Sequence, residues 1–340
     1  MGQLTSPPIS ARAIASWLIE SFNNEQKPLG TIQLLVSEAA SPSVFENPVN
    51  GVTTNISSAS LDNIEAALNH WTELADADPD NQVIFYFCGH GISQGASMVL
   101  LPEDYGSVDN AFRHAIDFMN IYDALDQYQS QQQVFFVDAC RNHTDAYILN
   151  KGQTLLQVRE RTAEGTRSAP IYFSTIAGEY SHARPNSVSL FTDALLHCLS
   201  NFGADRNDGQ WNVTNGGLLS SIDHLLTYYT EAELGYVVQV PDTAEVRGRF
   251  TIHSPQETPK AIMYVVGNPE GLFLSSRVVC EDQAEIQISE PNGADSSERI
   301  FFNVMSGTFK LIAEDDQSSQ LGLLEDYIQP PFMRFIMDLQ

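Results

Sequence analysis

Two short segments of the chain bring together residue types that can do nucleophilic chemistry. His90 lies between two glycines, and Cys140 follows it by 50 positions, within Asp138-Ala139-Cys140. A thiol with an ordinary pKa near ~8.5 is mostly protonated at neutral pH, so a neighbouring imidazole can assist its attack on a carbonyl carbon and then protonate the leaving amine. We therefore predict that Cys140 is a nucleophile and that His90 is its acid–base partner.

Attack on a carbonyl group produces an oxyanion, which needs preorganised hydrogen-bond donors. Glycine has no side chain to keep other groups away, so a backbone N–H next to it can approach a ligand closely. The backbone N–H groups of Gly91 and Cys140 are our candidates for the oxyanion donors.

Each of these two segments follows an apolar run that we predict to be a β-strand. The sheet formed by these strands would hold the two segments in place. Residues 83–88 and 134–137 are nearly continuous apolar strands, and helical patterns alternate with the strands. This alternation predicts an α/β fold with a mainly parallel sheet, helices on both faces, and ligands beyond the carboxyl ends of the strands. The predicted helices cover residues 11–23 behind a cap at Ser10, 61–74, 121–128, 191–199 and 218–229, and the predicted strands cover 31–36, 83–88, 134–137, 171–174 and 236–240.

The pattern changes after Pro255, where short β-type runs separated by Gly, Pro and Asn replace the alternation of strands and helices. We predict two domains, an α/β domain over residues 1–250 and a small β-sandwich-like domain over residues 255–340. Residues 301–311 resemble the strand–Gly–strand hairpin of transthyretin-like sandwiches. The predicted strands of the second domain cover residues 261–266, 272–279, 284–288, 300–304 and 308–313.

Taken together, the order strand, Gly-His-Gly, helix, strand, Asp-Ala-Cys resembles the caspase-like superfamily of cysteine peptidases, over about residues 10–240. His90-Gly91 matches the His-Gly motif of that superfamily, and Asp138-Ala139-Cys140 matches the Asp-x-Cys form of its metacaspases and paracaspases; CHAT-type proteases also belong to it. The resemblance implies a caspase-like sheet and peptide hydrolysis by a Cys–His dyad. Family members begin with an apolar strand before their first helix, whereas residues 1–9 contain no such run.

Specificity is predicted from the carboxylates near the dyad. Asp138 precedes Cys140 by two positions, so both side chains point to the same side of a strand, and the Asp138 carboxylate would line a pocket for Arg or Lys of a protein substrate. Caspases that cut after Asp carry Gln-Ala-Cys instead. Glu179, in the loop after the strand at 171–174, is a second candidate for this pocket. The alternatives are an Asp138 that accepts backbone N–H bonds in the next loop and a Glu179 that is simply solvated.

The segment after the nucleophile is a candidate for self-cleavage. Residues 142–169 contain four basic side chains, whereas the whole chain has only 17. An enzyme that cuts after basic residues could cut itself in an exposed loop, and related proteases often mature in this way. The alternative is an ordinary solvated loop. The candidate positions are Lys151, Arg159, Arg161 and Arg167.

Composition excludes several classes of function. The formal net charge of −26 opposes binding to a phosphate backbone, so we expect no direct nucleic-acid partner. No apolar run approaches the ~20 residues that span a bilayer, and the N-terminus lacks a signal-peptide pattern, so we expect no membrane partner and a cytoplasmic location. Four scattered cysteines predict reduced thiols and neither a metal site nor a cofactor; Cys88-x-His90 could begin a zinc site, but no Cys/His pair completes it. Nothing in the sequence indicates calcium dependence.

Two other functions remain open from the sequence. The chain could be a catalytically silent adaptor that binds a regulatory protein through its C-terminal domain, although an adaptor has no need of both His90 and Cys140. It could also be a ligand-binding module centred on residues 255–340, which would expose several aromatic side chains on one β-face.

Overall fold

The structure, a computed structural model, describes residues 4–39, 42–94, 97–142, 152–158, 166–207, 209–234, 239–289 and 298–340. The chain forms two compact units. The first comprises Met1–Leu196 and Ile222–Ile252, and the second comprises His197–Ser221 and His253–Gln340. No helix in the described ranges combines the length and the apolarity needed to cross a membrane.

A six-stranded sheet, in the order β10-β7-β6-β3-β4-β5, forms the centre of the first unit. Strands β3, β6 and β7 are parallel to one another, and the other neighbours are antiparallel. The sheet is therefore parallel at its centre, as its apolar strands require. Its strands are β3 (Gln82–Gln94), β4 (Ser97–Leu101), β5 (Ile116–Asp117), β6 (Gln132–Ala139), β7 (Ile171–Phe173) and β10 (Asp242–Ala244).

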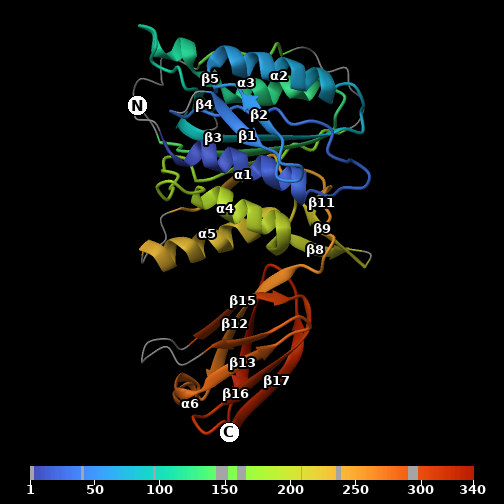
Figure 1. Cartoon of the computed structure of the whole chain (residues 1–340), viewed down its shortest axis with the longest axis vertical. Helices are drawn as coiled ribbons and strands as arrows, with labels where there is room; N and C mark the ends of the chain where they lie inside the picture. The colour runs from blue at the N-terminus through green and yellow to red at the C-terminus, as the bar shows by residue number, and fades with distance from the viewer. Residues whose placement is uncertain are drawn as a thin grey trace. The chain divides into compact units, whose positions relative to one another are not determined.

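Helices cover both faces of this sheet. Figure 1 shows α2 and α3 on one face and α1 and α4 on the other. Phe85 of β3 contacts the rings of Trp71 in α2 and Phe118 in α3, whereas the next residue, Tyr86, reaches Thr192 in α4. The predicted α/β class is confirmed. The helices are α1 (Ser6–Glu20), α2 (Leu61–Ala75), α3 (Phe118–Ala124), α4 (Leu190–His197) and α5 (Leu218–Leu234), with 3₁₀ turns η1 (Ala111–His114) and η2 (Leu125–Gln127). The π-helical turn η4 (Cys198–Phe202) and the first residues of α5, up to Ser221, belong to the second unit.

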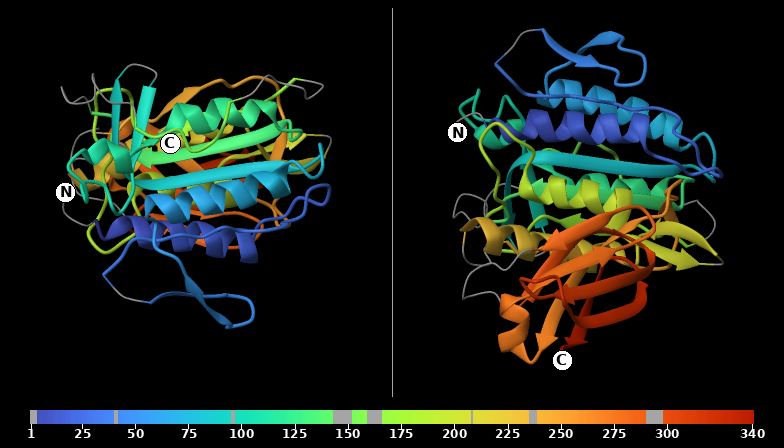
Figure 2. Two further views of the ribbon diagram at one scale, coloured as in Figure 1. Left: turned by 90° about the horizontal axis from the view of Figure 1, so that it is seen from above. Right: turned by 60° about the horizontal axis from the view of Figure 1, so that its bottom comes forward.

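Several predicted elements differ from the structure. The first helix begins at Ser6, ahead of the predicted cap, because prolines occupy its first turn, where a missing N–H costs nothing. The predicted strand at 31–36 does not form; Leu35 makes a single bridge with Ser57. The predicted strand at 236–240 lies mostly outside the described residues, and β10 is the strand beside β7. Strands β1 (Ser43–Glu46) and β2 (Thr53–Ile56) form a hairpin that the sequence did not predict; it projects away from the sheet (Figure 2).

The second unit contains two sheets that share one core, as a β-sandwich does. One sheet has the order β15-β12-β18 and the other β14-β13-β16-β17. Buried side chains of both sheets pack together, among them Met263 and Phe301 from the first and Cys280 and Leu311 from the second. The elements of these two sheets are β12 (Lys260–Asn268), β13 (Arg277–Glu281), β14 (Ile286–Ser289), β15 (Glu298–Met305), β16 (Gly307–Glu314), β17 (Gln320–Ile328) and β18 (Phe332–Asp338), with the short helix α6 (Glu270–Ser275) between β12 and β13. A further three-stranded sheet has the order β11-β9-β8. Its strands β8 (Ala204–Asn207) and β9 (Gln210–Thr214) belong to the second unit, whereas β11 (Thr251–His253) crosses the boundary between the units in the sequence.

Two predictions for this unit are wrong. The predicted hairpin at 301–311 is not a hairpin, because β15 pairs with β12 whereas β16 pairs with β13 and β17. The chain crosses between the sheets at Gly307, whose φ of 143° disfavours other residues. The predicted strand at 272–279 is helix α6 in its first half.

Candidate active site

The carboxyl ends of β3 and β6 bring the two predicted catalytic segments together. In this parallel pair, Cys88 lies opposite Asp138 and Gly89 lies opposite Ala139. His90 is the next residue of β3, which continues to Gln94 beside β4, and Cys140 is the first residue after β6. Because β3 and β6 are neighbours and run in the same direction, the imidazole and the thiol belong to the same edge of the sheet.

Gly91 packs directly against the backbone of the cysteine. A Cβ atom at Gly91 would lie 2.7 Å from the Cys140 carbonyl oxygen and 2.8 Å from Cε of Met98. Just beyond, the Ser93 N–H donates to the Asn142 carbonyl at 3.1 Å, and the Ser93 hydroxyl donates to the Arg141 carbonyl. The extended end of β3 therefore follows the chain past Cys140, and only glycine fits at position 91.

Cys140 differs from the other three cysteines in its surroundings. Its thiol is half-buried and lies 3.9 Å from the Ser181 carbonyl oxygen. Burial raises the pKa of Cys88 and of Cys198 well above the ordinary value, and it raises the pKa of Cys280 to about 12. Those three thiols remain protonated and are poor nucleophiles, because the thiolate is the reactive form.

Asp138, two residues before Cys140, is surrounded by uncharged side chains that donate hydrogen bonds to its carboxylate. We call Cys88, Ser181, Ser189 and Thr192 the cage around Asp138. Its side chain is only 3% exposed. Oδ2 accepts hydrogen bonds from the Ser189 hydroxyl, from Thr192 Oγ1 at 2.9 Å and from the Cys88 thiol at 3.5 Å, whereas Oδ1 accepts one from Ser181 Oγ at 2.8 Å. Burial raises the pKa of the Asp138 carboxyl, while the hydroxyl donors act in the opposite direction.

The cage orients Asp138 and links it to the cysteine. Ser189 Oγ also accepts from the Thr192 N–H at 3.1 Å, so it caps α4 while it donates to Asp138. Ser181 donates to Oδ1 through its hydroxyl, and its carbonyl lies beside the Cys140 thiol. The described donors are unevenly shared, three on Oδ2 and one on Oδ1, so the remaining acceptor capacity of this carboxylate is on Oδ1. The alternative of an Asp138 bonded to backbone N–H groups does not agree with these side-chain donors.

Arg141 supports the site in a way that the sequence did not reveal. Its guanidinium is buried, lies 4.0 Å from the centre of the Phe173 ring, and donates to the Thr175 carbonyl at 3.2 Å and to Asp242 at 2.6 Å. Its backbone N–H donates to the Glu179 carbonyl at 2.9 Å. Arg141 therefore joins the chain just after Cys140 to the loop that follows β7. The sequence does not predict this role of Arg141, because no local pattern identifies a distant partner such as Asp242.

The remaining predicted residues are the second pocket candidate and the four candidate self-cleavage positions. The Glu179 side chain is exposed, and its backbone contacts Arg141. Arg167 donates to Gln133 and to the Tyr122 carbonyl, and it stacks on the Tyr122 ring at 4.1 Å, so it is a poor cleavage site. Lys151, Arg159 and Arg161 lie outside the described residues.

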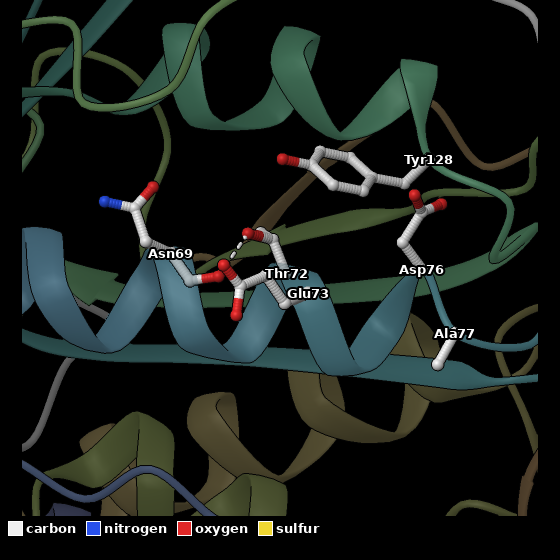
Figure 3. A pocket seen from close by; sticks show the side chains of 6 residues that line it. All are labelled: Asn69, Thr72, Glu73, Asp76, Ala77 and Tyr128. Atoms are coloured by element: carbon white, nitrogen blue, oxygen red, sulfur yellow. Dashed lines mark hydrogen bonds between the residues drawn. The ribbon is translucent and has the colours of Figure 1, made fainter.

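A polar hollow elsewhere in the first unit offers no competing catalytic pair. Figure 3 shows this hollow beside the C-terminal half of α2, where Asp76 also accepts from the Gln129 N–H at 2.7 Å. It is lined by Asn69, Thr72, Glu73, Asp76, Ala77 and Tyr128. These residues include no cysteine or histidine. Within the part of the chain that the structure describes, His, Cys, Asp and Glu side chains form no group of three or more that could hold a metal ion.

Comparisons with known proteins agree with this geometry. The sequence profile of a family described as Caspase domain matches residues 43–233, more than half of the chain. The chain is 26% identical to uncharacterized protein y4kE of Sinorhizobium fredii over 279 residues, which cover 80% of this chain and 79% of that protein. It is 24% identical to a probable protease of a Desulfuromonadales bacterium over 163 residues, 44% of this chain and 19% of the longer relative.

A solved structure is also similar. The crystal structure of caspase-1 from Spodoptera frugiperda aligns with a TM-score of 0.39 and 16% identity, covering 61% of this chain and 77% of that one.

Proposed function

This chain belongs to the caspase-domain family, and from that premise we propose that it is a cysteine endopeptidase with Cys140 as nucleophile and His90 as acid–base partner. The observation that carries the proposal is the pairing of β3 with β6, which ends with Gly89 opposite Ala139, one residue before His90 on one strand and one residue before Cys140 on the other. The relative named as a probable protease supports peptide hydrolysis as the reaction.

The proposed reaction has two halves. In the first, the Cys140 sulfur attacks the scissile carbonyl carbon, its proton passes to His90, and the oxyanion is held by the N–H groups of Gly91 and Cys140. Collapse of this intermediate breaks the C–N bond, and His90 donates its proton to the leaving amine. In the second half, water attacks the thioester while His90 accepts its proton, and the thiol is restored as the carboxylic acid product leaves.

We propose that the enzyme cuts after Arg or Lys. Oδ1 of Asp138 has one described donor, the hydroxyl of Ser181, whose carbonyl lies beside the Cys140 thiol, and a guanidinium or ammonium group would supply a second donor together with a compensating charge. An acidic side chain at that position would meet the buried carboxylate and be repelled. The Asp-x-Cys motif places the chain, in this proposal, with metacaspases and paracaspases. Glu179 would lie at the rim of the pocket.

Self-processing is part of the same proposal. The candidate positions are Lys151, Arg159 and Arg161, since Arg167 is bound to Gln133 and Tyr122. Cleavage near Arg159–Arg161 would give fragments of about 17–18 and 20 kDa at an average residue mass. Intact-mass spectrometry after prolonged incubation tests this: the active protein should divide and the Cys140→Ala protein should stay whole. Identical fragments from both proteins would point to a contaminating protease.

All four cysteines are free, which supports our proposal that the enzyme works in a reducing compartment such as the cytoplasm. A ligand-binding role for the second unit has less support. Among its described side chains, Phe332 is the only aromatic that is largely exposed, whereas a sugar-binding β-face presents several.

Fluorogenic peptides that differ only in Arg, Lys or Asp before the cleaved bond test activity and specificity together. We expect hydrolysis of the Arg and Lys peptides and little of the Asp peptide. Preference for the Asp peptide would overturn the proposal that Asp138 lines a pocket for basic side chains, but it would still be consistent with Cys140 as the nucleophile. A folded protein that hydrolyses none of them would favour the alternative of a silent adaptor that binds a regulatory protein.

A further inference from the structure

The outer face of the four-stranded sheet in the second unit is apolar where the outer face of a sandwich is normally polar. Residues along a strand point alternately into the core and towards solvent. The core of this unit contains Val278 and Cys280 from β13, together with Leu311 and Ala313 from β16. Val279 and Ile312 lie between these residues in the sequence and therefore point to the outer face. Both positions, where a solvated sheet would have polar side chains, are aliphatic.

A row of aliphatic side chains crosses this outer face on all four strands. Ile288 of β14 lies opposite Val279, and Leu323 of β17 lies opposite Ile312. Val279 and Ile312 are themselves opposite each other. Ile288 is 49% exposed and Leu323 is 48% exposed, and Ile286, beside Ile288 on the same face, is 64% exposed. We call Ile288, Val279, Ile312 and Leu323 the aliphatic stripe. Contiguous exposed apolar side chains of this kind mark an interaction surface.

Charged side chains flank the aliphatic stripe on both sides. On one side, Arg277 of β13 lies opposite Glu314 of β16, and Nη1 of the arginine is 3.6 Å from Oε2 of the glutamate. On the other side, Glu281 of β13 lies opposite Lys310 of β16. In the same direction across the stripe, the order on β13 is therefore positive, aliphatic, negative, and the order on β16 is negative, aliphatic, positive. Glu325 of β17, opposite Lys310, is exposed at the rim of the face.

This pattern of charges is complementary to itself. When two copies of a sheet pack face to face about a two-fold axis, the axis lies between the sheets and parallel to them. If the axis runs along the strands, β13 faces β16 of the second copy, so Arg277 faces Glu314. In the same arrangement, Glu281 faces Lys310. If the axis runs across the strands, Arg277 faces Glu281. Glu314 then faces Lys310. Opposite charges meet in both arrangements, and the aliphatic stripe covers its own counterpart.

The alternation of charge favours a second copy over other occupants of this face. A peptide or a membrane surface that carries one sign of charge would meet like charges on each side of the stripe. The net charge of −26 on the whole chain opposes association, but the two positive and two negative side chains around the stripe cancel. A second copy supplies aliphatic side chains and opposite charges at matching positions.

We propose that the outer face of β14, β13, β16 and β17 binds the same face of a second copy of this chain, so that the protein forms a two-fold symmetric dimer. This association does not depend on the proposed peptidase activity. Four strands about 4.8 Å apart, with about five residues each, give a face of roughly 19 by 17 Å. A face of this size is at the small end of protein interfaces, so we expect a dissociation constant of about 1–100 µM.

Sedimentation equilibrium of the whole chain tests the proposal. The chain carries Cys140→Ala, so that the proposed self-processing cannot change its mass. We expect the proportion of dimer to rise with protein concentration between about 1 µM and about 1 mM, a range that spans the expected dissociation constant. Leu323→Asp places a carboxylate in the aliphatic stripe, and it should raise the dissociation constant about tenfold or more, because a buried charge without a partner is unfavourable.

The matched control for Leu323→Asp is Ile336→Asp in the other sheet of the same unit. Ile336 is 69% exposed and lies between the core residues Phe335 and Met337 of β18, so it points away from the core. The same change of aliphatic side chain to carboxylate should therefore leave the dissociation constant unchanged at this position. The melting temperature of each variant shows whether it is folded, and the concentration dependence of the chain without these changes tests the proposal independently of them.

Charge reversal tests whether the two faces meet as the two-fold arrangement requires. Lys310→Glu should raise the dissociation constant about tenfold or more, because like charges then face each other across the interface. Adding Glu281→Lys to this variant should restore the dimer if the axis runs along the strands. Adding Glu314→Lys should restore it if the axis runs across the strands. We expect one of the two double variants to recover the association and the other to remain weak.

Several results would overturn the proposal. A chain that stays monomeric up to about 1 mM would show that this face does not bind a second copy. A dimer that is weakened by Ile336→Asp and not by Leu323→Asp would show that the copies meet through the other sheet. Recovery in neither double variant would show that the charges do not face one another. A dimer that none of these changes affects would be formed by a different surface of the chain.

Discussion

At position 91 the chain has no room for a side chain, because the backbone of Gly91 packs against the backbone of Cys140. This contact is the most direct one between the histidine segment and the cysteine. Because a Cβ would lie 2.7 Å from the Cys140 carbonyl oxygen, Gly91→Ala must push the two strand ends apart. We expect peptide hydrolysis to fall by roughly 10²-fold or more, with a smaller change in stability. The matched control is Gly216→Ala, which meets no atom within 4 Å. Equal activity in both variants would show that the approach of Gly91 to Cys140 is not needed.

Asp138 is the residue through which, in our proposal, both the specificity of the enzyme and its stability are determined. Asp138→Asn replaces a buried acceptor of four neutral donors with a group that accepts through one oxygen, so we expect a loss of stability of about 1–3 kcal/mol. Turnover of Arg peptides should fall by a larger amount, roughly 2–5 kcal/mol in transition-state binding, since the buried charge partner is gone. Turnover of a peptide with a neutral residue before the cleaved bond should fall much less.

The exposed Glu179→Gln serves as the comparison for Asp138→Asn and should change the Arg preference only slightly. If Asp138→Asn slows the Arg peptide and the neutral peptide equally, Asp138 positions the active-site loops and does not recognise the substrate.

The reactive residue types could be predicted from the sequence, but the cage around Asp138 could not. His90, Cys140 and Asp138 stand out because glycines and strand ends surround them. Ser181, Ser189 and Thr192 are common polar residues, and only the return of the chain from β7 to α4 brings their hydroxyls to one carboxylate.

At the scale of the elements, Arg141 connects the end of β6 to the loop after β7 through its hydrogen bonds. Arg141→Met keeps most of the contact with Phe173 but removes the hydrogen bonds to Thr175 and Asp242, and we expect a loss of stability of about 1–3 kcal/mol. Hydrolysis should fall further than stability explains, because the loop that carries Ser181 loses its support. Urea denaturation and turnover at saturating substrate measure the two effects. Arg277→Met, which breaks an ion pair in the second unit, should leave turnover unchanged.

Helix α5 contains a histidine whose titration should affect stability. Burial lowers the pKa of His224 to about 4, from an ordinary value near 6.5. The unfolded chain therefore binds a proton more readily than the folded chain between these two values, and stability falls as the pH drops from about 6.5 towards 4. Because the ring is only partly buried, solvent screening reduces the effect, and we expect it to contribute a loss of about 1–2 kcal/mol. Urea denaturation across that window should show a shallower loss for His224→Gln than for wild type, while the exposed His70→Gln should match wild type.

Strands and helices could be predicted where their composition favoured them and the elements they pack or pair with lay within the chain. The runs that became β3, β6 and β7 are apolar and pair with one another, so their pattern was sufficient. Residues 31–36 have the same kind of composition, yet they lack a partner beside them, and a strand forms only by pairing. Likewise, the turn at Gly307 resembled a hairpin turn, because nothing in residues 301–311 distinguishes a turn within a sheet from a crossing between two sheets.

For the molecule as a whole, the sequence indicated an α/β region followed by β-rich structure, since the spacing of apolar residues changes after Pro255. It did not indicate that residues 197–221, including β8 and β9, belong to the second compact unit. That division depends on contacts between segments far apart in the chain, which local patterns do not contain.

The central claim is that Cys140 and His90 act as one catalytic pair. Hydrolysis of an Arg-containing fluorogenic peptide by wild type, Cys140→Ala, His90→Ala and the double variant tests it most directly, with Cys280→Ala, in the second unit, as the control. We expect each single variant to lose about 10³-fold or more, the double variant to lose no more than either, and Cys280→Ala to remain active. Full activity in Cys140→Ala, or losses in the two single variants that multiply in the double variant, would contradict the account.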